Sequence, residues 1–182
     1  MRKTILGLFV FAGLAAAQPL GVGLKLGVPA TDAFNVVPFP NFTPLNAHSR
    51  PFTFGPFVEL RLPANMAIEV DALYRSYQFR SLGLNTNSWE FPVLVKHRFA
   101  SGLIRPYFDA GASFSRISDI NLATLKHRSN YGLVLGGGFD INALLIKFSP
   151  EIRYTAWGFK AFEGSGIESN RNQLTVLFGI GF

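Results

Sequence analysis

The last ten residues of the sequence, 173–182, constrain the fold most strongly. Apolar side chains occupy every second position there: Leu174, Val176, Phe178, Ile180 and Phe182. The positions between them are mostly small or polar. A period of two is typical of a β-strand with one apolar face, because successive side chains of a strand point to opposite sides of the sheet. The segment therefore predicts a terminal strand whose apolar face must be covered.

The same alternation recurs in seven earlier segments. They are residues 20–28, 51–62, 67–80, 88–100, 105–115, 130–141 and 144–159. Long polar connections at 29–50, 83–87, 116–129 and 160–172 alternate with short turns at 63–66, 101–102 and 142–143. Pro56, Pro92 and Pro150 lie within predicted strands and lack a backbone N–H, so we expect bulges or broken pairing there. The pattern predicts eight antiparallel strands in up-and-down order.

Composition and charge exclude several classes of protein. Charged residues make up 15% of the 182 residues, whereas about a quarter is usual for a soluble domain. The net charge is +6, but the basic residues are dispersed, which argues against a nucleic-acid groove. The chain has no cysteine, so disulfides and thiolate metal sites are excluded, and we expect no cofactor. Beyond the N-terminal segment, no apolar run approaches the ~20 residues of a transmembrane helix.

The N-terminal segment is predicted to be a cleaved signal peptide. Arg2 and Lys3 precede an apolar run at 5–14, and three alanines at 15–17 precede Gln18. This order of basic, apolar and small residues is typical of a secretory leader cleaved after Ala17. The expected organisation is a signal peptide at 1–17 and one β-barrel domain at 18–182.

The volume of the apolar face predicts which side of the sheet faces outward. An eight-stranded barrel has an interior just wide enough to be filled by side chains. The apolar positions include too many Phe, Leu and Ile residues to fit inside, whereas the opposite positions are rich in glycine. A membrane accepts strands only as a closed barrel, because every backbone group must be hydrogen-bonded internally. We therefore expect an all-β transmembrane antiparallel barrel with its apolar face in lipid.

Charged residues of the opposite parity are predicted to line the lumen as an ion-pair network. Buried charges are expected to be paired, and seven acidic residues nearly balance eight basic ones. They are Lys25, Glu59, Arg61, Glu69, Asp71, Arg75, Glu90, Lys96, Arg98, Arg105, Asp109, Asp140, Lys147, Glu151 and Arg153. Removing one of them, for example Glu90, should cost roughly 3 kcal/mol. Aromatic residues near strand ends should form interfacial girdles: Phe52, Tyr74, Trp89, Tyr131, Tyr154 and Phe182.

The chain resembles the small OmpA-type family of eight-stranded outer-membrane barrels. The resemblance rests on the leader, on Trp89–Phe99 (WEFPVLVKHRF), on Arg105–Gly111 (RPYFDAG) and on the terminal Phe182. It implies an integral protein of the cell outer membrane of a Gram-negative-type bacterium, with periplasmic termini and extracellular long loops. It also implies that Val176, Phe178, Ile180 and Phe182 form a C-terminal signal for the barrel assembly machinery. The expected partners are outer-membrane lipids and lipopolysaccharide, and the expected state is a monomer.

Three functions remain open at this level. The first is a structural or surface-interaction role, such as membrane integrity, adhesion or lipopolysaccharide contact, with the lumen plugged by ion pairs and no catalysis. The second is a narrow porin-like channel along the lumen charges. The third is a lipid A-modifying enzyme, since His127–Asn130 reads His-x-Ser-Asn, as in some barrel deacylases. That pattern starts the sixth predicted strand, whereas those enzymes carry it in the seventh.

Overall fold

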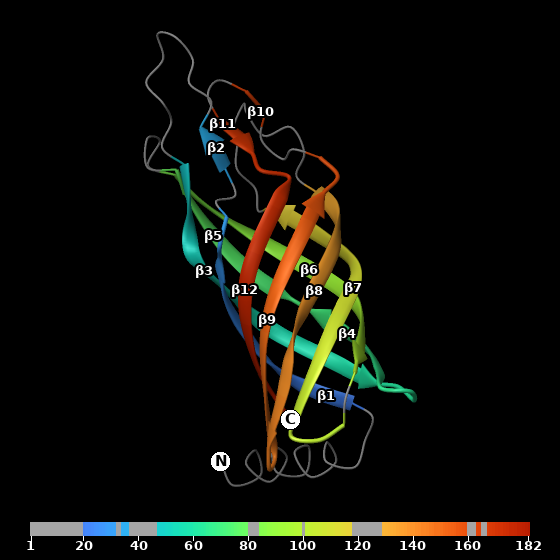
Figure 1. Ribbon diagram of the computed structural model, residues 1–182. Coiled ribbons are helices and arrows are strands. Elements are labelled where there is room, and N and C mark those ends of the chain that lie inside the picture. The colour runs from blue at the N-terminus through green and yellow to red at the C-terminus, as the bar shows by residue number, and fades with distance from the viewer. Residues whose placement is uncertain are drawn as a thin grey trace, which may run out of the picture.

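The computed structural model describes residues 20–31, 34–36, 47–79, 84–99, 101–117, 129–159, 163–164 and 167–182. These residues form a closed antiparallel β-barrel with a small separate sheet at one end (Figure 1). The predicted signal peptide, 1–17, lies outside them.

No helix long and apolar enough to cross a membrane occurs in the described ranges.

The barrel has eight strand positions, as predicted. They are occupied by β1 (Leu20–Pro29), β3 (Ala47–Arg61), β4 (Met66–Asp71) followed by β5 (Leu73–Phe79), β6 (Leu84–Arg98), β7 (Ile104–Ile117), β8 (Ser129–Ala143), β9 (Ile146–Trp157) and β12 (Asn172–Gly181). Successive positions pair antiparallel around the ring. Strand β1 closes the ring because it pairs with β12 on one side and β3 on the other.

Prolines interrupt the ladders at the predicted positions. Pairing of β3 with β4 ends at Phe57 and resumes with β5 at Phe54, so Pro56 is left out. Pairing of β6 with the same two strands omits Pro92. The single predicted strand 67–80 is therefore divided at Ala72, although the Ala72 N–H still donates to the Pro56 carbonyl at 2.9 Å. The β8–β9 ladder likewise has a gap at Pro150.

The connections are more ordered than the sequence predicted. Short strands β2 (Phe34–Val36), β10 (Glu163–Gly164) and β11 (Ile167–Ser169) form a three-stranded sheet within connections predicted to lack strands. This sheet joins the first long connection to the last because β2 pairs with β11. Strand β6 begins at Leu84, inside the predicted loop 83–87. The last short turn lies at Leu144–Leu145, not at 142–143.

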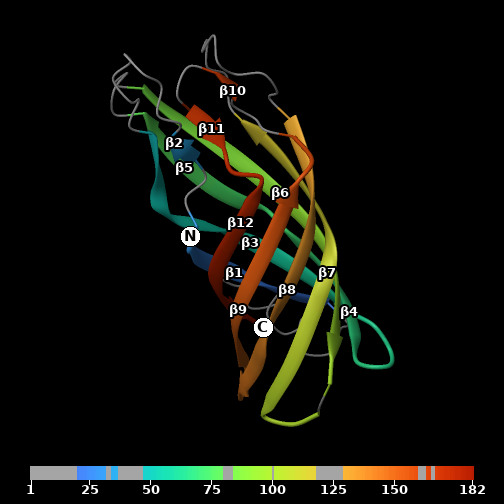
Figure 2. The ribbon, with the colours of Figure 1, turned by 45° about the horizontal axis from the view of Figure 1, so that its top comes forward.

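The two ends of the barrel differ. Three short turns and the C-terminus lie at one end, which we call the turn end (Figures 1 and 2). The three-stranded sheet lies at the other, the loop end. The predicted orientation of the two faces is confirmed, because apolar side chains such as Leu24, Val95 and Leu135 are exposed on the outside, whereas the alternate positions are buried inside.

Aromatic side chains gather on the outer face towards both ends. Near the loop end, Phe52, Phe54, Tyr74, Trp89 and Phe91 form a ladder across β3, β5 and β6, with ring centroids 5.4–6.3 Å apart. Near the turn end, His97, Phe99 and Phe108 form a cluster at 5.3–6.0 Å. Such paired aromatic bands are typical of barrels that cross a membrane.

Candidate functional site in the barrel lumen

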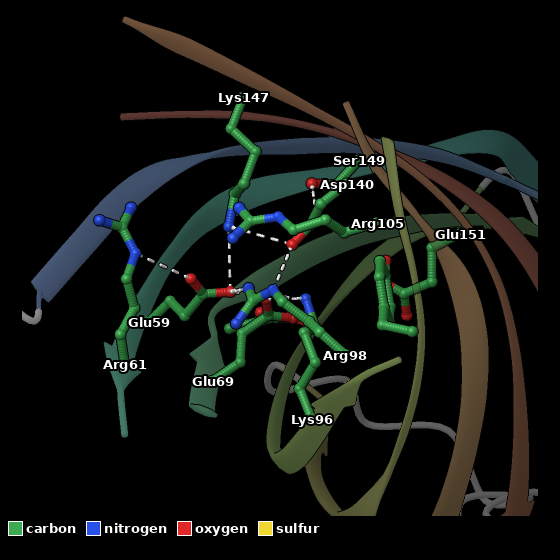
Figure 3. A network of polar contacts seen from close by, with 12 residues as sticks. Glu59, Arg61, Glu69, Lys96, Arg98, Arg105, Asp140, Lys147, Ser149 and Glu151 are labelled. Carbon is green, nitrogen blue, oxygen red and sulfur yellow. Dashed lines mark hydrogen bonds and ion pairs between the residues drawn. The ribbon is translucent and has the colours of Figure 1, made fainter. Parts of the chain in front are cut away.

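The lumen holds two interlocked groups of ion pairs. The lower cluster, nearest the turn end, consists of Glu59, Arg98, Asp140 and Lys147 (Figure 3). The central cluster consists of Lys25, Glu69, Asp71, Glu151 and Arg153. Lys96 connects the two, with its ammonium 2.6 Å from Glu69 and 3.7 Å from Glu59.

The lower cluster ties four strands together. Arg98 on β6 donates to Glu59 on β3 at 2.5 Å and to Asp140 on β8 at 2.6 Å. Lys147 on β9 donates to the same Glu59 oxygen at 3.0 Å. Ser149 donates its hydroxyl to the second Asp140 oxygen at 2.7 Å. Each carboxylate thus has more than one donor, which offsets the cost of removing it from water.

The central cluster crosses the lumen from β1 to β4 and β9. The Lys25 ammonium donates to Glu69 at 2.5 Å and to Glu151 at 2.9 Å. Arg153 donates to Glu151 at 2.6 Å and to Asp71 at 2.7 Å. Because these partners lie 44 to 126 residues apart in the chain, the contacts fix the relative positions of distant strands.

These charged side chains exclude water from the lumen. Glu59, Lys96 and Asp140 are 0% exposed, and Arg153 is 2% exposed. Exposures this low leave no path for a water molecule alongside them. Apolar and aromatic side chains complete the filling: Phe57, Leu94, Tyr107, Val134 and Leu177.

Phe57 shows how the interior was made to fit. Its ring is flanked by the ammonium groups of Lys25 and Lys147, at 5.5 Å and 5.7 Å from the ring centroid, a cation–π arrangement. A β-carbon on Gly23 or Gly181 would lie 2.5 Å and 2.8 Å, respectively, from the Phe57 ring. Glycine at these two positions therefore gives the ring its space.

The outer part of the lumen, towards the loop end, is different in chemistry. Arg75 lies 3.8 Å from Glu90 and donates to Gln173 at 2.8 Å. Ser113 donates to Glu90 at 3.0 Å, and Thr53 donates to the Tyr74 carbonyl at 2.9 Å. Neutral hydroxyl and amide groups thus replace most of the charges here.

The predicted lumen residues do not all join the network. Arg61 lies at the rim with a side chain 40% exposed and only a 3.4 Å contact to Glu59. Arg105 donates to Asn142 at 2.9 Å and makes no ion pair within the described ranges. Neither oxygen of Asp109 has a hydrogen-bond partner in the described part of the chain, although Asp109 is fully buried.

Residues selected by charge alone omit important parts of the filling. Tyr107 donates its hydroxyl to Glu151 at 3.2 Å and lies under the Lys96 ammonium at 4.2 Å. Ser149 and Gln173 also complete polar contacts. All three have the inward parity of their strands, so a reading by parity instead of charge would have included them.

The motif suggested for catalysis is only partly described. His127 lies outside the described residues, and Ser129 begins β8. Asn130 is committed to the backbone: its amide donates to the Phe159 carbonyl at 2.6 Å and its oxygen accepts from the Phe159 N–H at 3.1 Å. The side chain fastens β8 to the chain beyond β9, which is a structural role. No group of three or more metal-binding side chains occurs among the described residues.

No protein-family model matches the chain, and no characterised protein matches it in sequence. Solved structures show the likeness of fold. The outer membrane protein OprG from Pseudomonas aeruginosa is 14% identical, with a TM-score of 0.61 over 89% of this chain and 92% of that one. Neisserial surface protein A is 12% identical, with a TM-score of 0.57 over 90% and 95%. The N-terminal barrel of OprF from Pseudomonas aeruginosa is 12% identical, with a TM-score of 0.52 over 91% and 98%.

The predicted resemblance to OmpA-type eight-stranded barrels is therefore confirmed for the fold. The shared architecture spans nearly the whole described barrel, and it includes no copied active site from which an activity could be transferred.

Proposed function

We propose that the protein is an integral outer-membrane barrel with a closed lumen and a structural or surface-interaction role. The observation that carries this proposal is the interlocked pair of ion-pair clusters, whose central members are 0–2% exposed. A pore needs a continuous aqueous path, and these side chains occupy the place where it would run. The fold shared with outer-membrane proteins supports the location.

The membrane orientation follows from the two ends of the barrel. Barrels of this kind carry short turns on the periplasmic side and longer loops outside the cell. We therefore place the turn end and the C-terminus in the periplasm. The lipid-facing side chains of β12, Val176, Phe178, Ile180 and Phe182, would then serve as the signal read by the assembly machinery.

The three-stranded sheet at the loop end supports a role at the cell surface. Pairing of β2 with β11 links two long connections that come from opposite ends of the sequence. A linked outer face presents a defined surface to a partner, whereas independent loops would not. Contact of the basic loops with lipopolysaccharide phosphates belongs to this proposal.

Solute uptake into vesicles tests the closed lumen against the porin-like alternative. The protein is refolded into phospholipid vesicles, and swelling is followed in a solution of a small sugar. We expect swelling no faster than in protein-free vesicles. Swelling that scales with the amount of inserted protein would replace the proposal with a channel function.

A further inference from the structure

Two of the three short turns at the turn end carry apolar side chains where water would be expected. They are the β6–β7 and β8–β9 turns, and we call Leu103, Ile104, Leu144 and Leu145 the apolar turn pair. These side chains are 67%, 56%, 105% and 78% exposed, respectively. The third turn, at Pro63–Asn65, is small and polar by comparison.

Hydrogen bonds hold the two apolar turns together as one unit. The Asn142 N–H donates to the Leu103 carbonyl at 2.8 Å, and its side-chain amide donates to the Gly102 carbonyl at 3.2 Å. Arg105 donates to the Asn142 side-chain oxygen at 2.9 Å. The exposed side chains therefore form one continuous patch on a fixed backbone.

The backbone of the β8–β9 turn would be better served by another residue. Leu144 has φ 55°, in the left-handed region, where a two-residue hairpin turn favours glycine or asparagine. The third turn has the same feature at Ala64 and Asn65, with φ 61° and 59°, and uses a small and a polar residue. A leucine at position 144 is thus unfavourable for the turn and, in water, for solvation. Its side chain needs another explanation.

The patch continues the lipid-facing surface. Along β6, the outer face runs from Trp89 in the loop-end ladder to Phe99 in the turn-end cluster, ten residues apart. At about 3.3 Å per residue and a tilt of about 40°, this length spans about 25 Å along the barrel axis. That is the usual height of the apolar band of such barrels. The apolar turn pair lies just beyond Phe99, at the edge of this band.

We propose that the apolar turn pair inserts into the acyl-chain region of the adjoining lipid leaflet and anchors this side of the barrel. The proposal rests on the membrane location proposed above. The Pro63–Asn65 turn, in contrast, lies in water. One sector of the turn end is therefore seated more deeply in the bilayer than the other.

Spin labelling tests the proposal, because the sequence has no cysteine and single labels can be placed at will. Leu103→Cys and Leu144→Cys report on the apolar turn pair, Ala64→Cys on the polar turn, and Leu135→Cys on the middle of the lipid face. Each labelled protein is refolded into vesicles of a saturated phosphatidylcholine. Collisions of the label with oxygen, which concentrates in lipid, are compared with collisions with a water-soluble nickel complex.

We expect the ratio of oxygen to nickel collisions at positions 103 and 144 to be several-fold higher than at 64 and close to that at 135. Equal ratios at 144 and 64, with a lipid-like ratio at 135, would overturn the proposal and leave a protein partner as the occupant of the patch. A water-like ratio at 135 would instead overturn the membrane location itself.

A substitution with opposite consequences in water and lipid gives a second test. Leu144→Asn suits the left-handed backbone better, so in water it should stabilise the protein. In lipid it places an amide among acyl chains, and we expect a lower urea midpoint in vesicles. Ala64→Asn, the matched control in the polar turn, should leave the midpoint unchanged or raise it. A raised midpoint for Leu144→Asn would contradict the anchor.

Discussion

The lower and outer halves of the lumen are closed by different means. Near the turn end, charged side chains from four strands are fully buried and share each carboxylate among several donors. Near the loop end, the ion pair of Arg75 and Glu90 is longer, at 3.8 Å, and hydroxyl groups bond to single partners. The lower half therefore holds the barrel together across its width, whereas the outer half mainly completes neighbouring strands.

This difference predicts where the barrel is vulnerable. A buried charge that loses its partner is costly, because it can neither return to water nor find a new counter-ion. A neutral hydroxyl that is lost leaves only one unpaired group. Substitutions of similar size should therefore have large effects in the lower half and small effects in the outer half.

Glu59→Gln should have the largest effect. It leaves Arg98 and Lys147 facing a neutral amide inside the barrel. We expect a loss of about 3–5 kcal/mol in the free energy of unfolding, measured by urea titration in detergent micelles. Thr53→Val on the same strand is the control and should lose about 1 kcal/mol. Equal losses for the two variants would remove the distinction between the halves.

Gly138→Ala tests how tightly the lower half is packed. A β-carbon there would collide with the Pro150 carbonyl and lie 2.9 Å from the Tyr107 hydroxyl. We expect a loss of about 1–3 kcal/mol. The neighbouring Gly137 faces lipid with no atom nearer than 3.5 Å, so Gly137→Ala should cost nothing. A harmless Gly138→Ala would show that the interior has spare room.

Glu90→Leu measures the outer ion pair. Arg75 keeps its hydrogen bond to Gln173 when Glu90 is lost, and Glu90 is not fully buried. We expect a loss of about 1–2 kcal/mol, below that of Glu59→Gln, in the same urea titration. This revises the estimate made from sequence, which gave all lumen charges similar weight. A loss as large as that at Glu59 would restore that estimate.

Asp109→Asn should have the smallest effect in the lower half. The Asp109 carboxylate is fully buried without a hydrogen bond in the described part of the chain, and Glu151 lies near it on the other side of Gly136. Removing one of two neighbouring negative charges should change stability by less than about 1 kcal/mol, or increase it. A loss comparable with that of Glu59→Gln would place Asp109 among the essential charges.

The sequence predicted the barrel well because its period is a local property. Strand β7, expected at 105–115, spans Ile104–Ile117, and every inward position of that strand follows from parity. The division at Ala72 follows from prolines on both neighbouring strands, which a single segment does not reveal. Strands β2, β10 and β11 have two or three residues, too few for a period to be visible.

The pairing inside the lumen could not be predicted in the same way. Parity places Lys25 inside, but its partners Glu69 and Glu151 come from β4 and β9, and their height depends on the stagger of every strand between them. Arg61 has the correct parity and yet lies at the rim, because its strand ends there. The count of charges predicts balance, and the register decides which charges meet.

Conductance across a planar bilayer tests the central claim most directly. The claim is that the lower and central clusters close the lumen to ions as well as to larger solutes. We predict that the refolded protein, with insertion confirmed by its protease-resistant barrel, gives no current steps above the bare bilayer. Steady, reproducible steps would contradict the claim, because they would require an aqueous path past side chains that the structure shows to be fully buried.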